Sequence, residues 1–177
     1  MATPYGHTLV GLSLFNLWYS RTGLSNKKGF LVYGLIALGA SFPDLDFIPG
    51  LFLGQGSRFH HSYFHSLGMA CLVSLVVIVF FKVSKPEGPL LKTGGFILSL
   101  ILSHLFLDYL TEAPKGFPLF WPFTEIRFLS PIPVLPRVER NLGNPDFFAQ
   151  ALFCFSVESF LLLPLWAASL AKKALRK

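Results

Sequence analysis

Residues 93–111, TGGFILSLILSHLFLDYLT, join a long apolar run to two polar side chains near its end. The segment is close to the ~20 residues that a helix needs to cross a bilayer. His104 and Asp108 lie four residues apart, so they would share one face of that helix. Ionisable groups inside an apolar span are costly unless a partner or a metal ion compensates them. The segment therefore predicts a membrane-spanning helix with a polar site near one end.

The whole chain has the composition of a membrane protein. Hydrophobic residues make up 53% of its 177 residues and charged residues 14%, against ~45–50% and ~25% in soluble proteins. Apolar segments are found at residues 5–20, 29–42, 64–83, 93–111 and 147–171. We therefore expect an all-α, polytopic membrane protein with about five transmembrane helices, in which residues 1–177 form a single domain.

Basic residues are divided unevenly between the two sides of this arrangement. The loops after the first and third spans and the C-terminal segment carry ten Lys and Arg, whereas the other connections carry five, together with seven acids. The positive-inside rule then puts the N-terminus outside and the C-terminus in the cytoplasm. The charge is explained by this placement, and no dense basic run indicates nucleic-acid binding.

Residues 112–146 form the one long segment that does not span the membrane. Its seven prolines exclude a continuous helix. Its aromatic residues, Trp121 among them, favour the membrane interface. With the orientation above, we expect a Pro- and aromatic-rich loop on the outer side.

The same orientation brings every candidate metal ligand to the outer face. Imidazole and carboxylate groups are ligands of divalent metals, and the candidates outnumber the three or four protein ligands of one zinc ion. We therefore expect one or two divalent ions, with zinc as the first candidate. The predicted ligands are His7, Asp44, Asp46, His60, His65, His104 and Asp108.

Two details of this ligand set remain open in the sequence. Asp44 and Asp46 follow Pro43, where an extended backbone would turn them to opposite sides, so that one could bind a metal while the other orients a histidine. His61 is four residues from His65, and His60 is five, so either could be the ligand. The alternative to a metal site is a hydrogen-bond network that holds the helices together.

The order of these motifs resembles that of a known family. The motifs are HTLVG at 7–11, GASFPDLD at 39–46, HHSYFHS at 60–66, SHLFLDYLT at 103–111 and LFWPFT at 119–124. They are similar to those of bacterial inner-membrane-associated metal-dependent hydrolases, also described as LexA-binding or YdjM-like, over positions 1 to about 130. The layout resembles zinc-dependent phospholipase C more distantly.

The resemblance implies a location in the bacterial inner membrane and assigns the ligand histidines to His60 and His65. The family usually reads His-Arg-Gly-x-Thr-His-Ser at this motif. This chain has His61 and Phe64 at the Arg and Thr positions, which leaves the usual role of those two positions in doubt.

The leading functional hypothesis is a membrane-embedded hydrolase that cleaves a phosphoester of a lipid or lipid-linked substrate with a metal-bound hydroxide. Its catalytic candidates are Asp46, as a carboxylate that handles protons, Glu158, and Arg58, as a phosphate-binding side chain. Glu158 could be a general base, a metal ligand or a residue that pairs helices. Membrane lipids are the expected partners, and the oligomeric state is open. The alternatives are a metal transporter or sensor, which would need polar residues across the whole membrane, and a non-catalytic structural membrane protein.

Overall fold

The computed structural model describes residues 2–19, 26–55, 59–84, 89–112, 115–138 and 144–175. These residues contain six α-helices and one 3-10 helix. The prediction of an all-α fold is confirmed. The elements are α1 (Pro4–Trp18), α2 (Asn26–Ala40), η1 (Phe42–Phe47), α3 (Ile48–Phe52), α4 (Leu67–Ser84), α5 (Leu90–Tyr109) and α6 (Phe147–Ala174).

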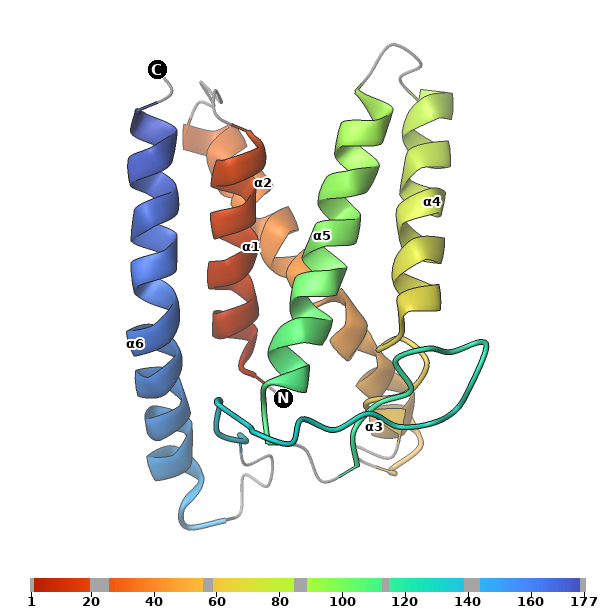
Figure 1. Ribbon diagram of the computed structural model, residues 1–177, viewed down its shortest axis with the longest axis vertical. Coiled ribbons are helices and arrows are strands. Elements are labelled where there is room, and N and C mark those ends of the chain that lie inside the picture. Colours follow the sequence, from red (N-terminus) through yellow and green to blue (C-terminus); the bar gives the residue numbers. More distant parts are fainter. Residues whose placement is uncertain are drawn as a thin grey trace.

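The longer helices form a bundle around α1 and α5. Helix α1 packs against α6, α2 and α5, and α4 packs against α5. Figure 1 shows α1, α4, α5 and α6 running along the long axis, with α2 inclined to them. The N-terminus, α3 and the loop after α5 lie at one end, and the C-terminal end of α6 lies at the other.

Among the described residues, three helices are long and apolar enough to cross a membrane: α4, α5 and α6. A fourth candidate is the pair Gly29–Ala40 and Phe42–Phe52, which is bent by 59° at a short break. Helix α1 has 15 residues, fewer than the ~20 of a full span. The structure therefore supports three or four candidate spans, and the fifth remains a prediction.

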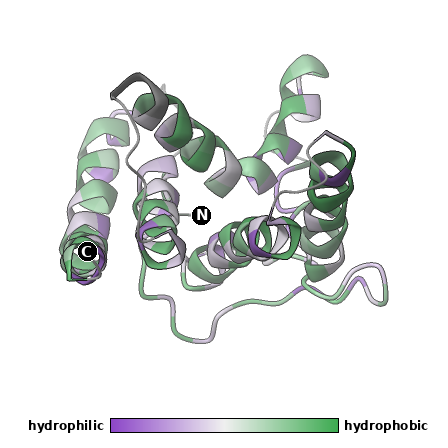
Figure 2. Cartoon of the chain, turned by 90° about the horizontal axis from the view of Figure 1, so that it is seen from above, coloured by the Kyte–Doolittle hydropathy of each residue, from purple (hydrophilic) through white to green (hydrophobic). Residues whose placement is uncertain are grey.

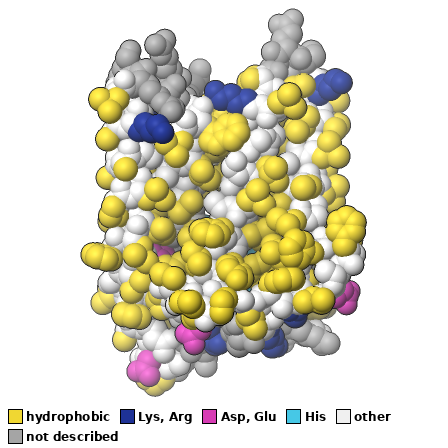
Figure 3. All heavy atoms as spheres, viewed as in Figure 1, with side chains coloured by type: hydrophobic (Ala, Val, Ile, Leu, Met, Phe, Trp, Pro, Cys, Tyr) yellow, Lys and Arg dark blue, Asp and Glu magenta, His cyan; other side chains and the backbone are white. Residues whose placement is uncertain are grey.

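The surface of these helices is suited to a lipid environment. On α4, large apolar side chains such as Leu72, Leu75 and Phe80 are more than half exposed. Seen from above, much of the ribbon of the longer helices has the colour of hydrophobic residues (Figure 2). In Figure 3, hydrophobic side chains cover most of the middle of this face, Lys and Arg lie at its upper end, and Asp and Glu lie toward its lower end together with further Lys and Arg. An exposed apolar belt of this extent is typical of a membrane-facing surface.

Local sequence explains the position of α1. The Thr3 side chain accepts a hydrogen bond from Gly6 N and so caps the helix, and Pro4 occupies its first turn. A Cβ on Gly11 would lie 3.1 Å from Ala40 Cβ and 3.2 Å from Leu100 Cδ2. The absence of a side chain at Gly11 therefore lets α1 approach α2 and α5 closely.

The chain between α5 and α6 is irregular in its described parts, residues 115–138 and 144–146, as its prolines predict. Two isolated bridges stabilise it, Thr111 with Leu135 and Phe117 with Phe128. This segment crosses the end of the bundle where α3 lies (Figure 1). It thereby closes the end of the bundle that carries the predicted ligands.

Candidate metal centre

Helix α5 supplies one histidine and one aspartate from a single face, as the sequence predicts. His104 and Asp108 are both buried, and His104 Nε2 lies 3.3 Å from Asp108 Oδ2. The spacing of four residues stacks the two side chains one helical turn apart. They form the fixed side of the cluster.

The break after α2 supplies two more carboxylates. Asp44 and Asp46 are both buried, but they lie in the 3-10 helix η1, so the expectation of an extended backbone is wrong. Pro43 stands in the first turn of η1, where its fixed φ favours a helical start and no N–H is needed. Asp44 Oδ1 lies 3.6 Å from His104 Nε2. Ionisable groups at a broken helix recur in ion sites of membrane proteins.

The three remaining histidines of the sequence motif lie in the loop before α4. The sequence predicted that this span begins at residue 64, but α4 begins at Leu67. Ser66 sets this boundary, because its Oγ accepts a hydrogen bond from Met69 N at 3.2 Å in the manner of an N-cap. His60, His61 and His65 are therefore not on a helix, and the spacing of four or five residues does not determine which of them share a side.

Four side chains from these three segments converge on one point. His65 Nε2 lies 3.7 Å from Asp44 Oδ1 and 3.3 Å from Asp108 Oδ2. The ligand atoms of Asp44, His65, His104 and Asp108 all lie within 4.8 Å of one another, and all four residues are buried. Two imidazoles and two carboxylates at this spacing could hold one divalent ion.

Hydrogen bonds to the outer ring nitrogens fix the direction of the histidines. His60 and His65 donate from Nδ1 to the two oxygens of Asp46, each at 2.9 Å, and His104 donates from Nδ1 to Ala40 O at 2.8 Å. These acceptors carry no proton, so each Nδ1 donates, and Nε2 is the ring nitrogen left to face the cluster. Asp46 therefore acts as the orienting carboxylate, the role that the sequence had allowed for one of the two aspartates.

The inward atoms lack partners of their own. Asp44 Oδ1 and Oδ2 and Asp108 Oδ2 accept no hydrogen bond from the described residues. His65 Nε2 and His104 Nε2 are 3.3 Å apart, and two lone pairs at that distance repel unless a proton or a metal ion lies with them. Burial lowers the pKa of His65, but the carboxylates of Asp108, Asp44 and Asp46 outweigh burial and raise it well above its usual value. The cluster therefore favours a positive charge at its centre.

His7 lies at the edge of this group. It is buried, its Nε2 is 3.5 Å from Asp108 Oδ1, and its ring stacks on that of His104 at 3.8 Å between centroids. Asp108 Oδ1 also accepts a hydrogen bond from Ala2 N at 3.1 Å. The N-terminal segment thus covers the cluster, and the prediction of His7 as a ligand remains open.

His61 belongs to the cluster, although the sequence offered it only as an alternative to His60. It is 8% exposed, and its Nε2 lies 3.4 Å from Asp108 Oδ2. Burial lowers the pKa of His61 to about 4, so the ring is neutral at neutral pH. The sequence signal for His61 was its spacing of four residues from His65, but His60 was an equally acceptable candidate at a spacing of five.

The other catalytic candidates are placed differently. Glu158 on α6 is buried and accepts hydrogen bonds from Thr3 N, at 2.6 Å, and from Thr3 Oγ1. It therefore anchors the start of α1, three residues before His7, and its catalytic role remains a prediction. Arg58 lies outside the described residues. The two oxygens of Asp46 are engaged with His60 and His65, which favours positioning over proton transfer.

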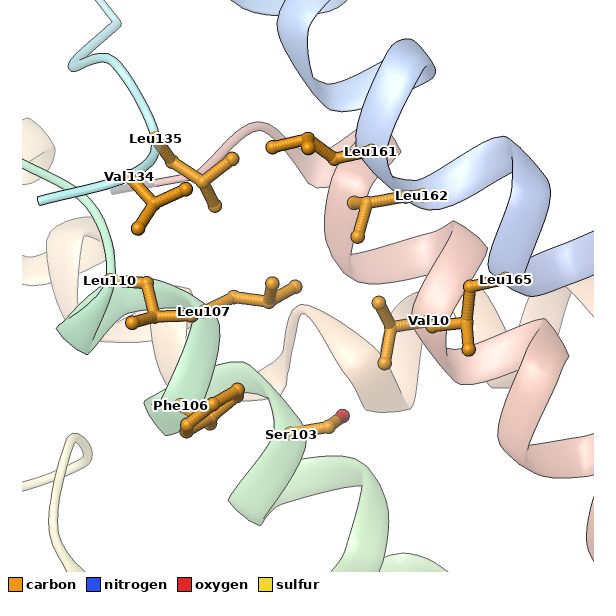
Figure 4. Close-up of a pocket in the computed structure, with 10 residues that line it drawn as sticks. All are labelled: Val10, Ser103, Phe106, Leu107, Leu110, Val134, Leu135, Leu161, Leu162 and Leu165. Carbon is orange, nitrogen blue, oxygen red and sulfur yellow. The ribbon is translucent and has the colours of Figure 1, made fainter.

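An apolar cavity of about 240 Å3 lies beside the cluster, on a neighbouring face of α5. Its lining side chains come from α1, α5, α6 and the loop between α5 and α6, and they point toward one another (Figure 4). The buried Leu107, Leu135 and Leu162 form its inner part, and the exposed Phe106 and Val134 lie at its rim. The full lining is Val10, Ser103, Phe106, Leu107, Leu110, Val134, Leu135, Leu161, Leu162 and Leu165.

Comparison with known proteins gives a match over almost the whole chain. The profile of the YdjM inner membrane protein family matches residues 1–171. The chain is 32% identical over 136 residues to the inner membrane protein YbcI of Escherichia coli K12, which covers 72% of this chain and 78% of that protein. No solved structure matches the chain.

Proposed function

This chain belongs to the YdjM inner membrane protein family, and we propose that it is a membrane-embedded, metal-dependent hydrolase of a phosphoester in a lipid or lipid-linked substrate. One observation carries the proposal: the ligand atoms of four buried side chains, Asp44, His65, His104 and Asp108, lie within 4.8 Å of one another. Such a set is costly in an apolar bundle and is a functional site by default. We place it near the outer face of the membrane.

The donor set suits a divalent ion, and zinc is the first candidate because it binds imidazole nitrogen and carboxylate oxygen with four ligands. A bound ion would supply Lewis-acid activation of water and of a phosphoryl oxygen. The chain's own residues prepare that chemistry. Asp46 holds the Nδ1 protons of His60 and His65, and the carbonyl of Ala40 holds that of His104, so that each Nε2 stays available.

The apolar cavity supports a lipid as the substrate. Its side chains are apolar except for Ser103, whose hydroxyl donates to Leu100 O at 2.8 Å and is thereby satisfied within α5. Leu107 faces the cavity, and the next residue along α5 is Asp108 of the cluster. An acyl chain seated in the cavity would lie next to the helix that carries the centre.

Transport is less well supported, because serine hydroxyls of α4 and α5 away from the cluster already donate hydrogen bonds within their own helices. Ser74 donates to Ala70 O at 2.7 Å, and Ser99 donates to Gly95 O at 2.8 Å. These hydroxyl protons are engaged by their own helices. Among the described residues, the groups of at least three potential metal ligands are confined to this one cluster.

The test is hydrolysis by purified, folded protein loaded with zinc. We would measure phosphate release from phosphatidic acid and headgroup release from phosphatidylglycerol, both in mixed micelles. We expect His104→Ala and Asp108→Ala to abolish cleavage, because each removes one of four ligands. Lys92→Ala is the control, since Lys92 lies near the opposite end of α5 over the ring of Tyr19, and it should stay within about twofold of wild type.

Cleavage of neither lipid by folded, zinc-loaded wild type would count against the hydrolase proposal. Zinc uptake into reconstituted vesicles in the same preparation would favour transport. Zinc binding with neither activity would favour the structural role.

A further inference from the structure

The position of His61 points to a second metal site beside the first. The four ligands Asp44, His65, His104 and Asp108 already suffice for one tetrahedral ion. His61 is more than nine-tenths buried, and its Nε2 has no hydrogen-bond partner among the described residues. A buried ring nitrogen of this kind, directed at a carboxylate 3.4 Å away, is suited to bind a cation placed beside that carboxylate.

The ring of His60 lies beside that of His61 and offers a second imidazole. The ring centroids of His60 and His61 are 4.3 Å apart, and His60 Nε2 lies 3.8 Å from Asp44 Oδ1. Ligand atoms of His60, His61 and His65 also lie within 4.8 Å of one another. Each of these rings thus approaches a carboxylate that also belongs to the first site.

The backbone of His61 is held in an unusual conformation by contacts with another segment. Its φ is 60°, a left-handed conformation that is unfavourable for a non-glycine residue, so its surroundings must impose it. Arg127 provides the restraint, because Nη2 donates to His61 O and to Gly116 O, and Nε donates to Lys115 O, each at 2.8 Å. One guanidinium therefore ties the histidine loop to the segment after α5.

We propose that His60 and His61 bind a second divalent ion, with Asp44 and Asp108 as carboxylates shared between the two ions. Paired ions of this kind, ~3.5–4 Å apart, clamp the attacking and leaving oxygens of a phosphoester. The proposal rests on the proposed function for its chemistry, but not for its metal count. Arg127 is a positioning residue for His61.

The experiment counts metal ions instead of activity. Apo-protein would be titrated with Co2+, and the visible absorption of the bound ion would be followed to saturation, with elemental analysis as the second readout. Wild type should bind two equivalents, and His61→Ala should bind one. Tyr63→Ala, an exposed change in the same loop, should still bind two.

A second variant leaves His61 itself in place. Arg127→Lys cannot donate to three carbonyls in one plane, so the second equivalent should bind at least tenfold more weakly while the first is unchanged. Arg137→Lys, a change of an exposed arginine, should bind both as wild type does.

The two proposals fail separately. A single equivalent in saturated wild type, or two in folded His61→Ala, would overturn the second site even if lipids are cleaved. Two equivalents without cleavage of any tested phosphoester would keep the second site and remove the hydrolase.

Discussion

His65 donates a hydrogen bond from Nδ1 to Asp46 Oδ2 across 2.9 Å, while its Nε2 lies 3.3 Å from Asp108 Oδ2 on the opposite side of the ring. The ring thus connects an orienting carboxylate to a candidate ligand. Asp46 makes the same bond to His60 and also accepts from Ser62 N at 3.0 Å. One carboxylate therefore fixes two histidines and the backbone of their loop.

This arrangement predicts that Asp46→Asn weakens metal binding without removing a ligand. An amide offers one acceptor where the carboxylate offers two, so one imidazole loses its orientation. We expect zinc affinity to fall by about 10- to 100-fold, as is usual for such outer partners. Competition with a chelator of known affinity would measure it. Glu125→Gln, on an exposed carboxylate, is the control, and an unchanged affinity for Asp46→Asn would contradict the orienting role.

The metal content of the protein tests the ligand set directly. Wild type purified without chelators should carry at least one divalent ion. Asp108→Ala should carry less than about 0.2 equivalents, because it removes a carboxylate proposed to be shared by both sites, and His104→Ala should lose the ion of the first site. Elemental analysis of the folded proteins gives the answer. Wild type that is as empty as the variants would rule out a metal centre.

The cavity predicts a split between lipid and short-chain substrates. Ser103→Phe should fill the space between Leu107 and Leu162 and reduce cleavage of a long-chain phospholipid by about tenfold, because the acyl chain is excluded. Cleavage of a short-chain, water-soluble analogue should change by less than about twofold. Leu102→Phe, on the same helix but outside the cavity, is the matched control. Equal losses on both substrates would argue against an acyl site.

Glu158 offers a test of position against catalysis. Its carboxylate accepts from Thr3 N and Thr3 Oγ1, so Glu158→Ala leaves two partly buried donors unpaired and should cost about 1–3 kcal/mol of stability. Thermal unfolding in detergent would show it as a lower Tm. If Glu158 only anchors α1, activity should fall in step with metal content. Lost activity with normal metal content and Tm in Glu158→Gln would instead make it catalytic.

The membrane orientation is open to a direct measurement. Reporter fusions after Lys28, Lys85 and Lys177 should be cytoplasmic, and those near Gly54 and Pro131 external, because basic residues are concentrated on the first side. Figure 1 shows α3 and the loop after α5 at the end opposite the C-terminal end of α6, so we expect the two sets of fusions to report opposite sides. A cytoplasmic signal at Gly54 would reverse the orientation.

The sequence by itself determined the helical class, because long apolar segments with few charges have few alternatives in a membrane. It also determined the pairing of His104 with Asp108, because a spacing of four residues has a fixed meaning within one helix. The helix boundaries deviated by a few residues. The helix α4 begins three residues later than predicted, because Ser66 accepts a capping hydrogen bond. The energy of one such bond is small compared with that of burying the apolar residues of the helix, so the apolar pattern alone does not indicate the boundary.

The division of roles within the site was decided only by the tertiary structure. Whether Asp44 or Asp46 faces the centre depends on the 3-10 turn at the break after α2, and the inclusion of His61 depends on Arg127, which is 66 residues away in the sequence. Glu158 likewise acquires its contact with Thr3 across 155 residues. Periodicity describes which residues share a face of one helix, whereas these contacts join loops and helices whose mutual placement follows from packing of the whole bundle.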